Sequence, residues 1–329
     1  KITKLGAWSG YSDQYACSFL DPMDPLFTKI QKLFLQQQKA IYGTDHIYGI
    51  DLFNELEPPS YKLSYLKRVA NQVYGSLAKA DKNAIWLQMT WLFYDDQKSW
   101  TNDRIKAYIT AYPPSKSILL DYYCERHEVW QQTNKYYGVP YIWCYLGNFG
   151  GNTMLAGNIA EVNKRIENTF KNGGKNFTGL GSTLESFDCN PFMYEYLFEK
   201  AWNFDTHKDV NRWAEHLADE HTGKVDDNAR KAWNILVNKI YIQSDYPGQC
   251  PVINIRPSFG GFKTYYSSPR IPYKNKELLQ ATELMLQADS KTQAHAFDVV
   301  NFTRQLISNY YGDVFKEYEQ AYNKNDFST

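Results

Sequence analysis

Two glutamates, Glu55 and Glu185, each follow a run of apolar and β-branched residues, at the point where a buried strand would end. Pro58 and Pro59 stop the first segment from continuing as a helix, and two glycines in the second permit close approach of backbone or ligand. A pair of carboxylates can cleave a glycosidic bond, because one protonates the leaving oxygen while the other attacks the anomeric carbon or activates water. Taken singly, either glutamate could equally be a strand-end residue paired with Arg or Lys.

Other chemical groups rank below these two. Asp51 should point as Glu55 does if strand alternation holds, so it could support a catalytic group or only satisfy a backbone N–H. His216 and His221 each follow a glutamate, but they are five residues apart, off one helical face, so we expect no metal site. Serine-hydrolase, nucleotide-binding and cysteine-protease signatures are lacking, and we expect no cofactor.

Strands that could position the two glutamates alternate with amphipathic stretches such as Pro25 to Tyr42 and Tyr61 to Ala80. Near-continuously apolar strands are typical of a parallel sheet built from βα units. No glycine-rich phosphate fingerprint follows any strand, so we favour an α/β fold of the (β/α)8 TIM-like barrel type over an open doubly wound sheet. The six predicted strands are Ile2 to Trp8, His46 to Phe53, Ala84 to Trp91, Ser117 to Tyr123, Tyr141 to Leu146 and Phe177 to Glu185.

The predicted barrel is incomplete at its start. Eight strands are needed and six are visible, so we expect the first two βα units to precede Lys1. The strands that lead to Glu55 and Glu185 are the second and sixth, four apart, and in a ring of eight they would face each other across the mouth. Carboxyl ends of barrel strands are where such enzymes place their catalytic residues.

The second part of the chain predicts a different domain. We assign residues 1–205 to the barrel and 206–329 to an all-α C-terminal domain, and Tyr246 to Tyr273 predicts a loop. The chain ends at residues 325–329 without a clear helix stop, which suggests that the helical domain is also incomplete. The helical segments are Asn211 to His221, Asp227 to Ile242, Lys276 to Ala288 and Phe297 to Tyr322.

Composition narrows the partners. Lys+Arg and Asp+Glu both number 36, so the chain has no net positive charge that would attract nucleic acid or an anionic membrane. No apolar run is long enough to span a membrane. Aromatic residues make up 16% of the chain; most will be core, but such rings can also stack on a sugar. Five cysteines lack CxxC spacing, and sequons at Asn176 and Asn301 tilt the location slightly towards lysosomal or secreted. Nothing in the sequence decides whether the protein is a homo-oligomer.

Two long segments carry a family resemblance. The stretch Gly43-Thr44-Asp45-His46-Ile47-Tyr48-Gly49 with Phe53-Asn54-Glu55-Leu56-Glu57-Pro58-Pro59-Ser60, and the stretch Tyr141-Ile142-Trp143-Cys144-Tyr145-Leu146-Gly147-Asn148-Phe149-Gly150-Gly151-Asn152, resemble signatures of the α-N-acetylglucosaminidases, glycoside hydrolase family 89. The similarity runs from Lys4 to Gln305 and favours animal lysosomal members over bacterial ones.

The resemblance implies a retaining glycosidase that removes terminal α-linked N-acetylglucosamine, with heparan sulfate as the usual lysosomal substrate. By position, Glu55 matches the family's acid/base and Glu185 its nucleophile. The resemblance also places six residues on segments that line the sugar pocket: Trp8, Asn54, Trp91, Trp143, Asn148 and Phe149.

One departure from the family keeps an alternative open. A glycine commonly follows the nucleophile in the family, whereas Ser186 follows Glu185 here. The alternative function is a catalytically silent sugar-binding protein on the same scaffold.

Overall fold

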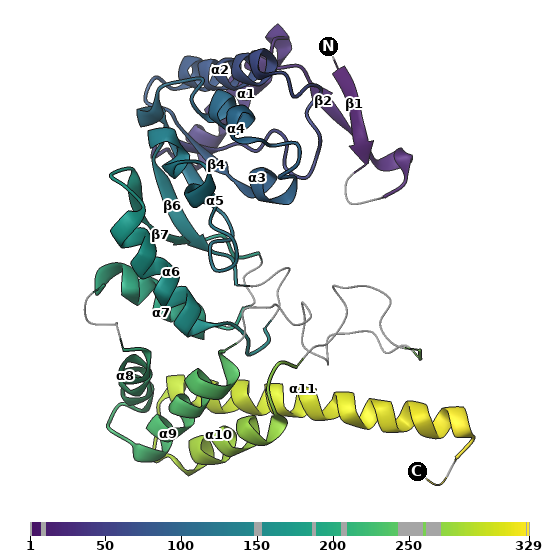
Figure 1. Ribbon diagram of the computed structural model, residues 1–329, viewed down its shortest axis with the longest axis vertical. Helices are drawn as coiled ribbons and strands as arrows, with labels where there is room; N and C mark the ends of the chain where they lie inside the picture. Colours follow the sequence, from purple (N-terminus) through teal and green to yellow (C-terminus); the bar gives the residue numbers. More distant parts are fainter. Residues whose placement is uncertain are drawn as a thin grey trace. The chain divides into compact units, whose positions relative to one another are not determined.

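The chain is described here by a computed structural model, and its residues form two compact units (Figure 1). The first comprises Lys1–Tyr145 and Ile166–Thr183, and the second comprises Leu146–Arg165 and Leu184–Thr329. The predicted domain boundary at residue 205 stays a prediction. The structure describes residues 2–7, 11–147, 153–185, 189–204, 209–242, 259–260, 271–326 and 328.

A parallel five-stranded sheet forms the centre of the first unit, in the order β3-β4-β5-β6-β7. Five of the six predicted strands belong to it, each shorter than predicted at one end or both, and β3 and β7 lie at its edges. An α/β architecture is therefore confirmed, whereas the described strands do not by themselves close a barrel. The strands are β3 (Ile47–Gly49), β4 (Ile85–Met89), β5 (Ser117–Asp121), β6 (Tyr141–Tyr145) and β7 (Phe177–Ser182).

The prediction that Ile2 to Trp8 is a barrel strand is wrong for the described residues. The strand β1 (Ile2–Ala7) instead pairs antiparallel with β2 (Ala16–Leu20), and the two form a separate two-stranded sheet. Exposure alternates along β1, and Lys4 reaches Ser18 Oγ at 2.9 Å across the pair. Such alternation is typical of a strand with one wet face, unlike the buried strands of a parallel sheet.

Local signals set the bounds of the long helix α1 (Pro25–Tyr42), which begins and ends where the sequence predicts. The Asp24 carboxylate accepts the backbone N–H of Leu26, Pro25 occupies the first turn, and Gly43 follows the last residue. The other helices that begin in the first unit are α2 (Leu63–Ala80), α3 (Trp91–Asp95), α4 (Asn102–Ile109) and α5 (Val129–Gln132). The helix α6 (Ile159–Asn172) precedes β7 in the chain.

The core of the first unit is built from α2 and from aromatic rings. Leu66, Val69 and Val73 of α2 are fully buried, as their three-and-four spacing predicts. Trp86 of β4 stacks on Tyr112 with ring centroids 5.2 Å apart and has a fully buried side chain. Ring pairs of this kind stabilise a core beyond the area they bury.

Two cysteine thiols lie beside the sheet. Cys124, just beyond β5, and Cys144, in β6, have no exposed surface, and the Cys124 N–H donates to the Cys144 carbonyl at 3.0 Å. Burial raises the pKa of both thiols well above its usual value, so both are protonated.

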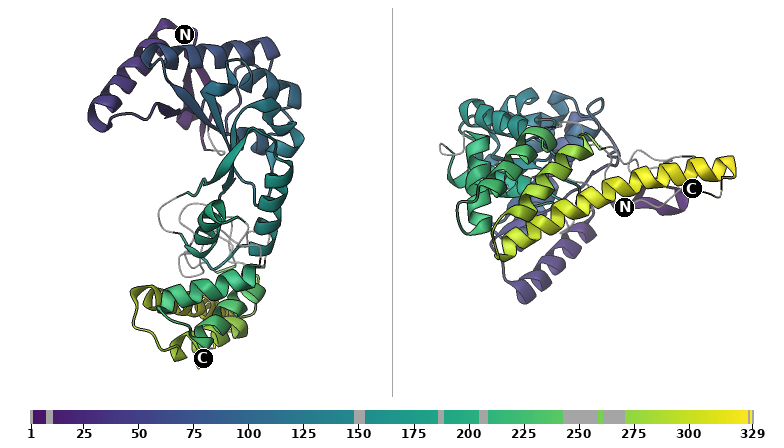
Figure 2. Two further views of the ribbon diagram at one scale, coloured as in Figure 1. Left: turned by 90° about the vertical axis from the view of Figure 1, so that its left-hand side faces the viewer. Right: turned by 90° about the horizontal axis from the view of Figure 1, so that it is seen from below.

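The second unit is helical, as predicted (Figures 1 and 2). Asp209 caps α8 and Asp226 caps α9, each by accepting two backbone N–H groups of the first turn. The last helix is long, and its C-terminal half extends beyond α8, α9 and α10 in Figure 1 and in the right-hand view of Figure 2. The elements are α7 (Phe192–Trp202), α8 (Val210–Thr222), α9 (Asp227–Ile235), a π-helical turn (Leu236–Ile240), α10 (Asn275–Gln287) and α11 (Gln293–Lys324).

The predicted loop Tyr246 to Tyr273 lies largely outside the described residues. Among the described residues, no helix has both the length and the apolar character required to cross a membrane.

Candidate active site

Glu55 lies in a tight turn after β3. The strand ends at Gly49, earlier than predicted. Phe53, four residues later, is buried in the core, where it is 1% exposed and contacts Phe19 with ring centroids 5.4 Å apart. Glu55 itself is exposed and has φ of 52°, the left-handed conformation that non-glycine residues rarely adopt. The buried phenylalanine therefore anchors a strained turn that presents the Glu55 carboxylate, and strained backbone of this kind clusters at functional sites.

Trp91, at the start of α3, contacts the same carboxylate. Its indole Nε1–H donates to Glu55 Oε1 at 2.9 Å. The half-buried indole also meets the rings of Tyr94 and Tyr122, with centroids 5.1 and 5.5 Å away. The ends of β3 and β4 thus bring together two residues that the sequence assigns to the site.

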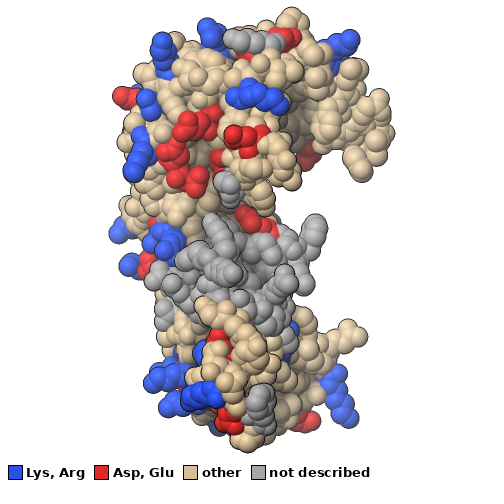
Figure 3. All heavy atoms as spheres, turned by 90° about the vertical axis from the view of Figure 1, so that its right-hand side faces the viewer, with Lys and Arg blue, Asp and Glu red and all other residues tan. Residues whose placement is uncertain are grey.

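A cavity of about 200 Å³ adjoins Glu55 and is strongly acidic. Glu57, Asp95 and Asp96 line it with Glu55, and Figure 3 shows acidic side chains gathered on one face of the first unit. Burial raises the pKa of the Asp95 carboxyl, and the charges of Glu55 and Asp96 raise it further. The sequence does not single out Asp95, because it lies at the end of the helix α3 and not directly after a strand.

Asp96 behaves differently from its neighbour. Burial acts to raise its pKa, but hydrogen bonds from the Ser99 side chain and N–H, and from the Tyr61 hydroxyl, outweigh it and lower the pKa. The Tyr61 hydroxyl lies 3.1 Å from Asp96 Oδ2. Asp96 therefore lines the cavity as an ionised carboxylate that is held by hydrogen bonds.

Asp51 and Asn54 occupy distinct positions near the turn. Asp51 Oδ1 accepts the Met89 N–H at 3.3 Å, the backbone role that the sequence left open for it. Asn54 Oδ1 is buried and has no hydrogen-bond partner among the described residues. A buried acceptor without a donor is costly, and a ligand N–H or O–H would satisfy it.

Trp143 is a core residue of β6. Its side chain has no exposed surface, and its Nε1–H donates to Glu128 Oε1 at 3.0 Å. Glu128 is 7% exposed and also accepts bonds from Trp130, Gln131 and Thr169. The structure thus places Trp143 within a buried polar network, and its contact with a sugar stays a prediction.

Glu185 follows β7 by three residues and is exposed. Within β7, a Cβ added at Gly181 would lie 2.9 Å from the side-chain atom Ile142 Cγ2, whereas a Cβ at Gly179 meets nothing within 4 Å. The close approach of backbone or ligand at these glycines stays a prediction. Glu185 belongs to the second unit and Glu55 to the first, and the facing arrangement of the two carboxylates stays a prediction. Trp8, Asn148, Phe149 and Ser186 lie outside the described residues.

Comparison with known proteins identifies the class to which this fold and site belong. The family model for the alpha-N-acetylglucosaminidase TIM-barrel domain matches residues 1–204, and that for the C-terminal domain of the same enzymes matches residues 213–329. The chain therefore belongs to the alpha-N-acetylglucosaminidase family. It is 32% identical to alpha-N-acetylglucosaminidase from Homo sapiens over 98% of its own length and 43% of the relative's.

Solved structures show the same fold. A family 89 glycoside hydrolase from Clostridium perfringens, in complex with 2-acetamido-1,2-dideoxynojirmycin, matches with a TM-score of 0.80 at 23% identity, over 98% of this chain and 36% of that one. A complex of a Clostridium perfringens relative with its substrate GlcNAc-alpha-1,4-galactose matches with the same TM-score over 99% of this chain. The chain thus spans less than half the length of these relatives.

Proposed function

We propose that the full-length protein is an α-N-acetylglucosaminidase that removes terminal non-reducing α-linked N-acetyl-D-glucosamine with retention, by double displacement. Membership of the family supports the substrate class. The observation that carries the chemistry is the exposed Glu55 carboxylate, held in a strained turn beyond β3 and contacted by an indole N–H.

The proposed roles divide the reaction between two glutamates. Glu55 is the general acid that protonates the glycosidic oxygen and then the base that activates water. Glu185 is the nucleophile that forms the glycosyl ester. Its exposed position beyond β7 supports this role, since β3 and β7 are four strands apart in the sheet order.

Stereochemistry supports an enzymic nucleophile. In β-linked N-acetylhexosaminides the 2-acetamido group can attack the anomeric carbon from behind. An α-linked leaving group lies on the same face as that acetamide, so backside attack by the substrate is geometrically excluded. The protein must then supply a carboxylate on the opposite face.

Asn54 is the proposed sugar contact with the most direct structural support, because its buried Oδ1 lacks a donor among the described residues. A hydroxyl or acetamide N–H of the substrate could supply that donor. The other proposed sugar contacts are Trp8, Trp91, Trp143, Asn148 and Phe149.

We also propose that, in the full-length protein, further strands pair with the edge strand β3 and close the sheet into an eight-stranded barrel. The described residues contain five parallel strands, and a closed (β/α)8 barrel has eight. A groove of about 520 Å³ lies between α1 and β3, and Phe34 on its wall is 68% exposed. Of the 18 residues of α1 only Leu35 is buried, which leaves its apolar face for further βα units to cover.

Heparan sulfate-type glycans are the proposed natural substrate, and a lysosomal or secreted location is proposed with them. The sequon at Asn176 offers little support, because its Nδ2 donates to the Lys135 and Val139 carbonyls at 2.7 and 2.6 Å. An amide nitrogen engaged twice is not available to carry a glycan.

The test is release of p-nitrophenol from its α-N-acetylglucosaminide by the full-length protein, with Glu55→Gln and Glu185→Gln as variants. We expect activity that Glu185→Gln abolishes. Glu55→Gln should slow turnover, because the base that activates water is lost, although p-nitrophenolate can leave without a proton. Azide should yield the β-glycosyl azide with Glu185→Ala, since azide then attacks from the nucleophile's face, and the α-glycosyl azide with Glu55→Ala. A folded protein that binds N-acetylglucosamine without releasing p-nitrophenol would instead identify a sugar-binding protein.

A further inference from the structure

In the hydrogen bond between Trp91 and Glu55, the indole is the donor and one oxygen of the carboxyl group is the acceptor. The indole nitrogen carries a hydrogen and has no acceptor lone pair, so it can only donate. It lies 2.9 Å from Oε1 of Glu55. In a protonated glutamic acid the carbonyl oxygen accepts such a bond, and the acidic hydrogen resides on the other oxygen. The indole therefore distinguishes the two oxygens of an otherwise symmetric carboxyl group.

The surroundings of Trp91 hold its indole in place. Its ring contacts those of Tyr94, Tyr122 and Tyr123, with centroids 5.1, 5.5 and 6.0 Å away. Several ring contacts restrict the rotation of a two-dihedral side chain, so the N–H direction is fixed before any ligand binds.

The helix that carries Trp91 also carries an acidic residue, Asp95, close to Glu55. Asp95 lies four residues after Trp91 in α3 and lines the same cavity as Glu55. Burial raises the pKa of Asp95, and the charge of Glu55, which lines the same cavity, raises it further. The helix α3 thus carries both the indole donor to Glu55 and an acidic side chain that faces the same cavity.

We propose that Trp91 is a positioning residue for the acid step, which directs the transferable proton of Glu55 to Oε2. In that step the Oε2–H proton moves to the glycosidic oxygen while the C1–O bond breaks and its electron pair stays on that oxygen. Oε1 retains the indole hydrogen bond throughout and stabilises the carboxylate that forms. This inference rests on the proposed function, and it gives Trp91 a role other than that of a stacking platform for the sugar.

The experiment compares two leaving groups in the full-length protein with Trp91→Phe, which keeps a ring and removes the N–H. Methanol leaves poorly and needs the proton, whereas p-nitrophenolate leaves without one. We expect kcat/KM for the methyl α-glycoside to fall about 10- to 100-fold and that for the p-nitrophenyl α-glycoside by less than about threefold, within the range that general acid catalysis contributes. The ratio of the two values does not depend on how much of the variant folds.

Trp202→Phe is the matched control, because Trp202 is 88% exposed at the end of α7 and should leave both kcat/KM values unchanged. Glu55→Gln should show the same selectivity as Trp91→Phe, with a larger loss. An equal loss on both substrates in Trp91→Phe would overturn the positioning role and favour a sugar platform. A wild-type protein inactive on both glycosides would overturn the proposed function itself.

Discussion

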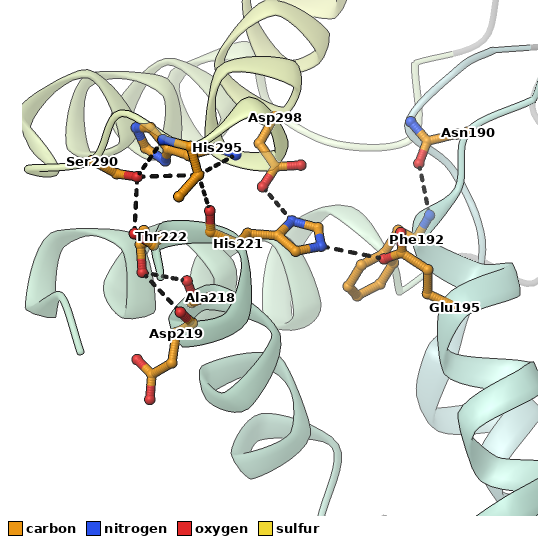
Figure 4. A network of polar contacts seen from close by, with 11 residues as sticks. Asn190, Phe192, Glu195, Ala218, Asp219, His221, Thr222, Ser290, His295 and Asp298 are labelled. Carbon is orange, nitrogen blue, oxygen red and sulfur yellow. Dashed lines mark hydrogen bonds and ion pairs between the residues drawn. The ribbon is translucent and has the colours of Figure 1, made fainter. Parts of the chain in front are cut away.

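His221 Nδ1 lies 2.7 Å from Oδ2 of Asp298 and so ties α8 to α11 within the second unit (Figure 4). Its Nε2 lies 3.9 Å from Oε2 of Glu195 on α7. One imidazole therefore faces carboxylates from two other helices. Burial acts to lower the pKa of His221, but the Asp298 hydrogen bond and charge, with Glu195 and Glu220, raise it above 6.5 overall.

We expect this contact to make the second unit more stable in mild acid. A raised histidine pKa in the folded state gives stability that is present below about pH 6.5 and is lost as pH rises through the folded-state value. Burial also raises the pKa of Asp298 and of Glu195, although His221 opposes both rises, and their contributions likewise decline as pH rises. Urea denaturation between about pH 6 and pH 8 should therefore show a falling free energy of unfolding.

The variant His221→Gln should flatten that pH dependence and cost about 2 kcal/mol at pH 6, as expected for a hydrogen bond to a charged group. His216→Gln is the control, because His216 is exposed on the same helix. A steep pH dependence that survives in His221→Gln would rule out this histidine as its source.

Asp121 should produce a pH dependence in the first unit. It has no exposed surface, and its two carboxylate oxygens accept the Val129 and Trp130 N–H groups at 3.2 and 3.0 Å. Burial and, to a lesser extent, the charge of Glu128 raise the pKa of Asp121 to about 7, although the hydrogen bonds from Val129 and Trp130 lower it. Because the folded-state pKa lies above the ordinary value of 3.8, stability is lost as pH rises from about 4 to about 7, and the first unit should weaken across that window.

Replacing Asp121 by Asn should remove this dependence, since an amide does not ionise. The variant loses one of two acceptors, so we expect it to be less stable than wild type at about pH 5 and to approach or exceed wild type at pH 8. Unfolding curves at both pH values check this. Parallel pH profiles for the two proteins would contradict the assignment to Asp121.

Glu128 should be a major source of stability because one buried carboxylate accepts four side-chain donors. In Glu128→Gln one carboxylate oxygen becomes an NH2 group, which would face a side-chain donor instead of accepting its hydrogen bond. We therefore expect the free energy of unfolding to fall by about 2–4 kcal/mol. Trp143→Phe removes one donor and should cost about 1–2 kcal/mol. Denaturant titration measures both; a Trp143→Phe variant with unchanged stability and a raised KM would assign Trp143 to the sugar pocket instead.

Two glycines should respond in opposite ways to alanine. A Cβ at Gly173 would lie 2.5 Å from both the Thr169 carbonyl oxygen and the Tyr141 hydroxyl, whereas a Cβ at Gly75, inside α2, meets nothing within 4 Å. Gly173→Ala should destabilise by about 1–3 kcal/mol through overpacking. Gly75→Ala should stabilise by about 0.5–1 kcal/mol, because glycine is costly inside a helix. Thermal melts of the two variants in parallel test both signs, and a stable Gly173→Ala protein would refute the close approach.

The parts of the structure that depend on local signals could be predicted from the sequence. The cap, the first-turn proline and the terminal glycine of α1 lie within a few residues of its ends, and its bounds were predicted correctly. The strand β1 was misassigned because its partner β2 is determined by pairing across a turn, which an apolar run does not reveal.

The candidate site was predicted in part for the same reason. A strand followed by Asn54, Glu55 and two prolines marks a loop that presents a carboxylate, and the structure confirms that Glu55 is exposed there. The bond from Trp91 joins segments 36 residues apart and could not be read from either one. Burial of Trp143 was equally hidden, because a tryptophan in an apolar strand looks the same whether it faces a ligand or the core.

The rate at which a thiol reagent modifies the buried Cys124 and Cys144 can report local opening of the sheet. A thiol reagent attacks the thiolate, and these side chains are neither exposed nor ionised in the folded state. Each can be modified only when the ends of β5 and β6 separate, so the rate of modification reports how often that part of the sheet opens. The same reagent, applied with and without a bound sugar analogue, would show whether occupancy of the site slows opening, with no probe introduced into the chain.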